Sequence, residues 1–328
     1  MSTGQPNPYP RLLADIGGTN ARFALETGPG VIEDIDVLPC NSYATLADAM
    51  RSYLEGAHTR AVHHAAIGIA NPVNGDRVQM TNHHWSFSIE ETRQALGLHT
   101  LLVLNDFTAL ALSLPHLPAD ELVQVGGGEA KPGAKALIGA GTGLGVSGLL
   151  PAGSDWVAIA GEGGHVAFSP LNDDEAALLR YAQTRFGEHV SAERFLSGPG
   201  LELIHDALCV QAGEAAGQLS AAQISERGLS GRDARCVRVL ELFCAMLGSA
   251  AANLALTLGA VGGVYIGGGV VPRLGEFFTR SAFRARFEAT GRFAAYTGAM
   301  PVYVIHSPYP ALTGVRAALR SHLGEHDA

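Results

Sequence analysis

Two carboxylates stand where apolar runs of the sequence end. Asp15 lies in LLADIGGTNARFAL, immediately before a glycine-rich turn between two strand-like runs. Asp106 follows Asn105 in LLVLNDFTALALSLPHL, where a buried strand gives way to an amphipathic helix. A carboxylate beyond the carboxyl end of a strand could accept a hydroxyl proton during a transfer reaction. Plainer roles stay open: Asp15 could cap its own turn, and Asn105-Asp106 could be only a helix N-cap.

Three glycine-rich turns follow apolar strands. They are Gly17-Gly18-Thr19, Gly141-Thr142 in ALIGAGTGLGVSGLL, and Gly267-Gly268-Gly269 in VYIGGGVVPRL. Backbone N–H groups of such turns can hold phosphates without lysine or arginine, and the two threonines add hydroxyl donors. The magnesium that accompanies ATP would need a carboxylate nearby, and Asp15 is placed for this. Each turn taken alone could be a simple connection.

A fourth cluster could bind a polyol. Glu162 and His165 lie three residues apart in GEGGHVAFSP, and Glu193 follows in SAERFLSGPGLE at an expected helix start. Carboxylates accept from hydroxyl groups, and imidazole both donates and accepts. The set lacks the spacing of a zinc site, and Glu193 with Arg194 could be only a solvated surface pair.

Composition restricts the class of protein. The 328 residues are 47% hydrophobic and carry a net charge of −9 without long charged runs, which argues against nucleic-acid or membrane partners. The four cysteines form no CxxC pair, and the N-terminus has no apolar signal core, so we expect a cytoplasmic protein. The uncharged stretch 244–271 is predicted to be a buried helix ending near Leu258 and then a strand, GVYIG.

Helical and extended patterns alternate along the chain, which predicts an α/β fold. The hairpin pattern around Gly18-Thr19 returns around Gly141-Thr142, which suggests two related domains. We expect a small domain of residues 1–117 plus 308–328 and a large domain of residues 118–307. GLGVSG matches a dinucleotide fingerprint, but the sequence after it stays extended, so we predict no Rossmann helix there.

The motifs together resemble a known family. LLADIGGTNARFAL, LNDFTALA, IGAGTGLGVSGL, GEGGH, ERFLSGPGLE and VYIGGGVVPRL are similar, in this order, to motifs of the bacterial ATP-dependent glucokinases of the hexokinase and actin-like ATPase superfamily. The resemblance implies two ribonuclease-H-like domains with glucose and Mg-ATP in the cleft between them. It also implies a C-terminal helix that returns to the first domain, and a homodimer. The related ROK kinases carry clustered zinc-binding cysteines after the sugar-binding histidine; here the next cysteine is Cys209, so we expect no zinc and the non-ROK group.

The resemblance also assigns residues. Asp106 is the expected general base, and Asp15 the expected magnesium ligand. The sugar-binding set would be Asn105, Asp106, Glu162, His165 and Glu193. The nucleotide and phosphate set would be Ala14, Asp15, Ile16, Gly17, Gly18, Thr19, Gly141, Thr142, Gly267, Gly268 and Gly269.

Other readings compete with glucose phosphorylation. A kinase of fructose, mannose or N-acetylglucosamine would carry much the same motifs, because one hydroxyl orientation separates these sugars. A sugar-sensing regulator would keep the fold without transferring phosphate. A filament-forming or chaperone-like ATPase of the superfold would need large inserted subdomains, for which this chain is too short.

Overall fold

The computed structural model describes residues 8–57, 62–81 and 83–325. Their contacts divide them into two compact units. The first holds residues up to 117, 152–160 and those from 307 onward, and the second holds 118–151 and 161–306. Residues 152–160 therefore group apart from the expected large domain, because β11 (Asp155–Ile159) packs against α3 (Asp106–Ser113). The expected boundaries of the two domains therefore remain a prediction about which parts of the chain fold independently.

A five-stranded sheet forms the centre of the first unit. Its order is β3 (Val31–Pro39), β2 (Asn20–Gly28), β1 (Arg11–Ile16), β4 (His64–Ile69) and β7 (Thr100–Asn105). β1, β4 and β7 run parallel, whereas β2 and β3 continue antiparallel from β1. The carboxyl ends of the three parallel strands consequently meet at one edge, directly before the residues expected to react.

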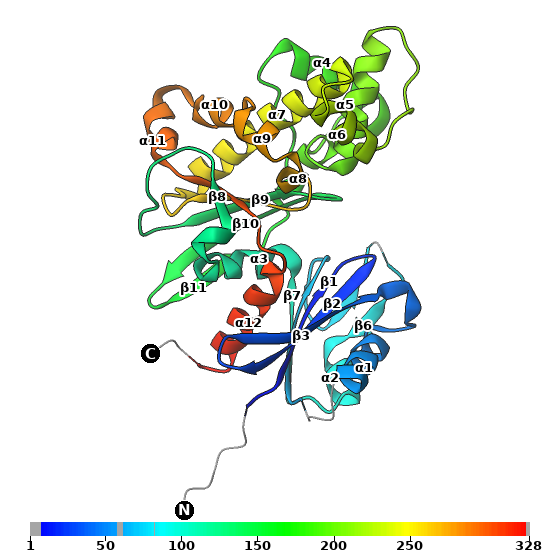
Figure 1. The fold of residues 1–328 in the computed structure, drawn as a ribbon, viewed down its shortest axis with the longest axis vertical. Helices are drawn as coiled ribbons and strands as arrows, with labels where there is room; N and C mark the ends of the chain where they lie inside the picture. Colours follow the sequence, from blue (N-terminus) through cyan, green and yellow to red (C-terminus); the bar gives the residue numbers. More distant parts are fainter. Residues whose placement is uncertain (1–7, 58–61, 82, 326–328) are drawn as a thin grey trace, which may run out of the picture. The chain divides into compact units, whose positions relative to one another are not determined.

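Helices cover both faces of this sheet (Figure 1). Alternation along β1 sends Leu12, Ala14 and Ile16 into the core beneath α1 (Leu46–Ala57), and Leu13 to the opposite face with α3 and α12 (Pro310–His322). α12 approaches α3 so closely at Gly314 that a Cβ there would collide with the carbonyl oxygen of Ala109. The expected return of the C-terminal helix to the first domain is confirmed by this contact. The remaining elements of the unit are β5 (Arg77–Gln79), β6 (Ser86–Ser88) and α2 (Ile89–Ala95).

The second unit repeats the same strand arrangement. Its six-stranded sheet has the order β11, β10 (Leu144–Ala152), β9 (Lys135–Ala140), β12 (Val264–Gly267), β13 (Val302–Ile305) and β8 (Leu122–Gln124), with β11 as an edge strand. An antiparallel hairpin, β9–β10, again precedes parallel strands, β12 and β13. This correspondence with β1–β2, β4 and β7 confirms the predicted repeat. β10 continues as a strand where a dinucleotide fingerprint would need a helix, as predicted.

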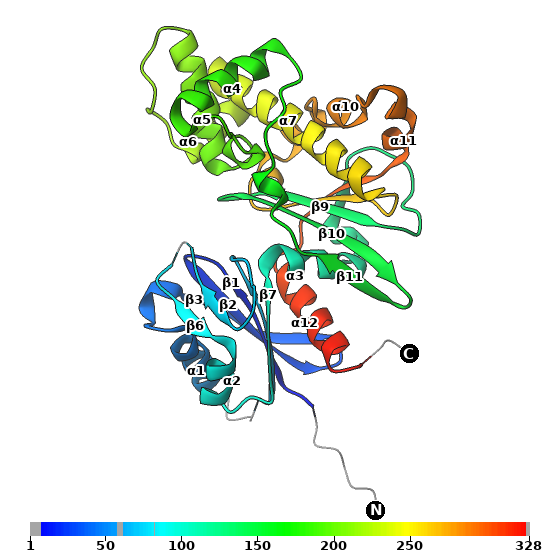
Figure 2. The same cartoon turned by 180° about the vertical axis from the view of Figure 1, so that it is seen from behind.

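The long helix α7 (Ala234–Leu258) lies against β9 in this unit (Figure 2). Among the described residues it is the one helix long and apolar enough to span a membrane, yet 61% of its most apolar window is buried in the fold. Core packing against α6 (Ala221–Leu229), α5 (Gly198–Gln211) and α10 (Phe283–Glu288) accounts for its hydrophobicity. The predicted helix end at Leu258 and the following strand are both confirmed. The other helices of the unit are α4 (Asp173–Phe186), α8 (Val271–Leu274), α9 (Glu276–Arg280) and α11 (Ala294–Ala299).

Candidate active site

Strand register brings the candidate residues of the first unit together. Asp15 on β1 pairs with Gly68 on β4, and Ile69, one residue further, pairs with Asn105 at the end of β7. Asp106 is the next residue and begins α3. Asp15, Asn105 and Asp106 therefore lie at one edge of the sheet, and the charge of Asp15 acts on Asp106.

Only one carboxylate oxygen of Asp106 accepts hydrogen bonds from other described residues. Its Oδ1 accepts from the backbone N–H of Phe107 at 2.9 Å and from Nδ2 of Asn105 at 3.0 Å. No other residue in the described part of the chain donates a hydrogen bond to its Oδ2. Burial, with the nearby charge of Asp15, raises the pKa of Asp106 to about 6 against the lowering effect of the Phe107 N–H. Such a carboxylate has an open oxygen and a proton affinity suited to general base catalysis near neutral pH.

Asn105 positions this carboxylate from the helix N-cap. Its Oδ1 accepts from the N–H groups of Phe107 and Thr108, and its Nδ2 donates to Asp106 and, at 3.4 Å, to the carbonyl of Asn71. The plain interpretation of Asn105 as a helix cap is therefore correct, and it does not exclude a functional one. The same side chain caps α3 and fixes the orientation of Asp106.

Asp15 is held by an arginine of the neighbouring strand. Its Oδ2 accepts from Arg22 at 3.1 Å, and the pKa of Asp15 is nevertheless raised, because burial outweighs the attraction of the guanidinium. Arg22 stands directly opposite Asp15 in the β1–β2 hairpin. The two carboxylates thus share an edge at which negative charge is unfavourable without a further cation or proton.

In the first glycine turn, the backbone N–H groups of Gly18 and Thr19 are open to a ligand, whereas that of Gly17 is not. Gly17 N–H donates to the carbonyl of Asn20 at 2.9 Å and closes the turn, so it is already occupied. No described residue accepts from the N–H of Gly18 or Thr19, and Thr19 is exposed. Ala14 and Ile16 are fully buried in β1, so their side chains position the turn from the core.

The second turn repeats this pattern. Gly141 N–H donates to Gly143 at 2.8 Å, and the carbonyl of Gly141 accepts from Gly198 at the start of α5. Thr142 is exposed at the tip. At the end of β12, Gly268 has φ +78°, and a Cβ there would collide with the backbone of Ala140, whereas Gly269 faces open space.

The proposed sugar ligands of the second unit lie on two paired segments. Ala167 and Ser191 form an isolated antiparallel bridge, and the Ala192 N–H donates to Val166. This pairing places the short 3-10 helix Gly163–His165 against the short helix Ala192–Arg194, which carries Glu193.

The three side chains differ in how firmly they are held. Oε2 of Glu193 accepts from the N–H of Leu144 at 2.9 Å, where Gly143 leaves it room. Glu162 and His165 face each other at 3.9 Å, and each side chain is 58% exposed. Glu193 is thus positioned by the fold, whereas the other two are free to adjust to a ligand.

Two residues of the first unit were not identified from the sequence. Arg22 becomes visible only once the hairpin register pairs it with Asp15. Asn71 follows β4 at the same edge; its Oδ1 accepts from the N–H and hydroxyl of Thr81, and its carbonyl accepts from Asn105. Its position after a parallel strand, in IANPVNG, is the signal that could have revealed it.

The donor set fits magnesium held together with phosphates. Within the described ranges, no three His, Cys, Asp or Glu side chains gather as a metal cage. Magnesium characteristically uses one or two carboxylates, several waters and substrate phosphates. Asp15, partly buried and with a raised pKa beside a turn with unused N–H groups, suits that role.

Comparisons with known proteins bear on the family of the chain. The family model described as Glucokinase matches residues 12–322. The chain is 64% identical to a protein named glucokinase from Chromobacterium violaceum, over 98% of this chain and 93% of the relative. A solved glucokinase from an Antarctic psychrotroph is 36% identical with a TM-score of 0.87, covering 95% of this chain and 99% of that one.

A more distant likeness bears on the fold alone. A ROK family glucokinase from Streptomyces griseus, solved with glucose and AMPPNP, is 20% identical with a TM-score of 0.64, over 95% of this chain and all of that one. Together with the solved glucokinase at 36% identity, this likeness confirms the expected α/β class with two actin-like ATPase domains.

Proposed function

The chain belongs to the glucokinase family, and from this premise we propose how its own residues carry out the reaction. The enzyme transfers the terminal phosphoryl group of ATP to the 6-hydroxyl of glucose, giving glucose 6-phosphate and ADP. The observation that carries the mechanism is the open Oδ2 of Asp106, on a carboxylate whose pKa is raised to about 6.

Asp106 is the proposed general base. Oδ2 accepts a hydrogen bond from the 6-hydroxyl and takes its proton as the bond from O6 to the γ-phosphorus forms. The bond from that phosphorus to the bridging oxygen breaks, and its electrons leave with ADP. Phosphoryl transfer needs mainly alignment and charge neutralisation, so orienting the hydroxyl is the larger part of this role. Asn105 holds Oδ1 and leaves Oδ2 directed to the acceptor.

The glycine turns are the proposed phosphate contacts. The N–H groups of Gly18, Thr19 and Thr142 donate to phosphate oxygens, while Gly17 and Gly141 keep the turns closed through their own hydrogen bonds. Gly269 leaves open space beside the nucleoside. When bound, magnesium supplies positive charge against the phosphates. Asp15 would hold it, directly or through water.

Glu193, Glu162 and His165 are the proposed partners of the sugar hydroxyls. Glu193 is fixed by the Leu144 N–H and acts as a rigid acceptor. The exposed pair Glu162 and His165 supplies an acceptor and a group that both donates and accepts. Specificity for another hexose is not favoured, because the relatives at high identity are named glucokinases.

We also propose a cytoplasmic homodimer without nucleic-acid or membrane partners. The net charge of −9 is unfavourable for binding nucleic acid or an anionic membrane surface. The apolar helix α7 is accounted for by its burial within the second unit.

Omission of single components tests the reaction. ADP is expected only when glucose, magnesium and ATP are all present, and a hexose panel should show glucose as the preferred acceptor. Asp15→Asn should raise the magnesium concentration needed for half-maximal rate at least tenfold, whereas Asp48→Asn, an exposed control on α1, should not. Sugar binding without ADP formation would instead support the non-catalytic regulator.

A further inference from the structure

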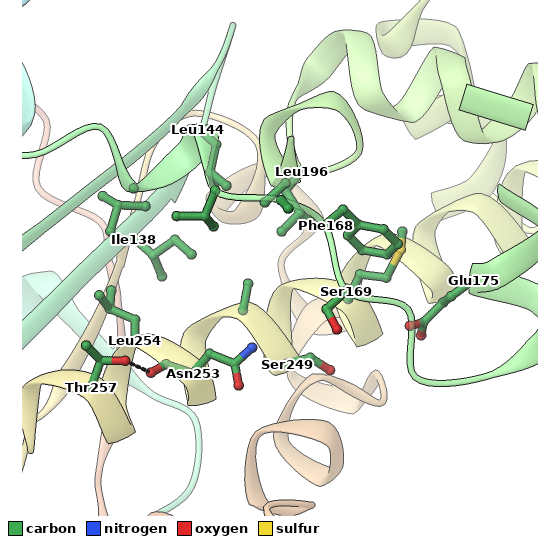
Figure 3. Close-up of a pocket in the computed structure, with 17 residues that line it drawn as sticks. Ile138, Leu144, Phe168, Ser169, Glu175, Leu196, Ser249, Asn253, Leu254 and Thr257 are labelled. Atoms are coloured by element: carbon green, nitrogen blue, oxygen red, sulfur yellow. Dashed lines mark hydrogen bonds between the residues drawn. The ribbon is translucent and has the colours of Figure 1, made fainter. Parts of the chain in front are cut away.

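The second unit contains a pocket that the proposed reaction does not use (Figure 3). It has a volume of about 240 Å³ between α7 and the segment 163–169 and is open to solvent on one side, where Val166 is 59% exposed. Its apolar wall consists of Ile138, Leu144, Phe168, Leu196, Met246 and Leu254. None of the glycines or threonines assigned to phosphate or nucleoside lines it, so it is separate from the proposed nucleotide contacts.

The size of the pocket fits a small organic molecule. A dry cavity of roughly 150 Å³ lined by aliphatic and aromatic side chains is large enough to bind benzene. This pocket is larger and most of its wall is apolar, so it can take a ligand of one or two rings.

The polar groups of the pocket select for a neutral ligand. The carboxylate of Glu175 is already satisfied by Arg286 at 2.7 Å, Asn172 at 3.2 Å and the N–H of Leu171 at 2.8 Å. Ser249 accepts from the same guanidinium. The side chains of Asn253 and Ser169, in contrast, have no hydrogen bond to any described residue. They offer a hydrogen bond to the polar end of an uncharged molecule.

The wall of the pocket connects it to the proposed sugar site. Gly163 and the run from Val166 to Ser169 line it, and these residues flank His165 and follow Glu162. The same run is paired with the segment that leads to Glu193. A ligand in the pocket therefore bears on the backbone that carries the proposed sugar ligands.

We propose that this pocket binds a neutral, largely apolar small molecule with one hydrogen-bonding group, and that its occupancy alters the affinity for glucose. The binding step stands independently, whereas the coupling step rests on the proposed roles of Glu162, His165 and Glu193.

Indole is a suitable probe for binding, because it has a flat apolar body and one N–H donor. Calorimetric titration of the full chain should show one site. Ala250→Phe, which fills the pocket from α7, should weaken binding at least tenfold. Asn253→Leu, which keeps the side-chain size but removes the amide, should weaken it about fivefold. Gln211→Leu, exposed at the end of α5 and outside the pocket, should change nothing. Absence of binding to the unsubstituted chain, or equal binding by Ala250→Phe, would overturn the proposal.

A second measurement tests the coupling. Saturating indole should change the dissociation constant of glucose at least threefold, and glucose should change that of indole by the same factor, as linkage requires. An unchanged glucose affinity would refute the coupling while leaving the binding site intact. Failure to form ADP from glucose and ATP would refute the proposed function instead. If Ala250→Phe dissociates a dimer and the unsubstituted chain does not bind indole, the proposal is overturned, because a second copy of the chain then occupies the pocket.

Discussion

Replacing Asp106 with asparagine should lower activity and raise stability at the same time. Asparagine keeps the shape of the side chain and an Oδ1 that can accept from Phe107 at 2.9 Å and Asn105 at 3.0 Å. It loses the oxygen that we propose accepts the proton, so kcat should fall by about 10² to 10⁴. The neutral amide still contacts the hydroxyl, so we expect the dissociation constant of glucose to change less than threefold.

The gain in stability follows from the perturbed carboxylate. Burial and the charge of Asp15 raise the pKa of Asp106 from 3.8 to about 6. The folded chain therefore binds this proton more tightly than the unfolded chain, and ionisation costs the fold up to about 3 kcal/mol. The cost is absent below about pH 4, grows between pH 4 and 6, and is complete above pH 6. Asparagine removes it, which corresponds to about 4 °C in Tm for a chain of this length.

A coupled assay for ADP with both substrates saturating measures kcat, and thermal melts at pH 4 and pH 7.5 measure stability. Activity of the unsubstituted enzyme should also be about tenfold lower at pH 5 than at pH 7, since the base is then mostly protonated. A kcat within tenfold of the unsubstituted enzyme would refute the assignment of Asp106 as base. An equal change in Tm at both pH values would refute the electrostatic origin of the stability gain.

Three substitutions elsewhere separate function from folding. Gly143→Ala introduces a Cβ that would displace Oε2 of Glu193 from the Leu144 N–H without moving the backbone, so KM for glucose should rise at least tenfold while Tm stays within about 2 °C; an unchanged KM would contradict the role of Glu193. Gly268→Ala should lower Tm by several degrees, because φ is +78° and the new Cβ meets rigid backbone of Ala140; a melt at the unsubstituted temperature would contradict this. Arg286→Met leaves the Glu175 carboxylate buried without its cation and should cost about 3–5 kcal/mol in denaturant unfolding. A loss below about 1 kcal/mol would show that the buried carboxylate does not depend on this cation.

Local patterns were sufficient to predict the fold where strands are apolar and turns are rich in glycine. The hairpins around Gly18 and Thr142, the end of α7 at Leu258 and the extended course of β10 were all predictable, because each depends on sequence neighbours. The grouping of β11 with the first unit depends instead on packing against α3, which is distant in sequence. The series of short helices from Val271 to Ala299 has the same limitation, because such short helices rely on tertiary contacts.

In the candidate site, too, some residues could be located from local sequence patterns, whereas their contacts required the structure. Asp15, Asn105 and Asp106 could be located because each stands at a strand end, and the topology of parallel strands brings such ends together. The partner Arg22 required the pairing register of the hairpin. The sequence does not distinguish one glycine N–H group from another, whereas in the structure the N–H groups of Gly17 and Gly141 close their turns. Hydrogen-bond geometry of this kind has no signature in residue types.

Without substrates, the ionised carboxylates of Asp15 and Asp106 at the sheet edge destabilise the fold. A carboxylate retained for structural reasons would be expected beside its counter-charge, as Glu175 is beside Arg286. Among the described residues, those that donate to Asp106 are neutral N–H groups, and Arg22, which is hydrogen-bonded to Asp15, does not suffice to lower the pKa of Asp15. Burial has thus raised the pKa of both groups with too little local compensation. Substrate groups that bring a proton to Asp106 and positive charge to Asp15 would relieve both costs together, which is the arrangement expected if this edge is the proposed site of phosphoryl transfer.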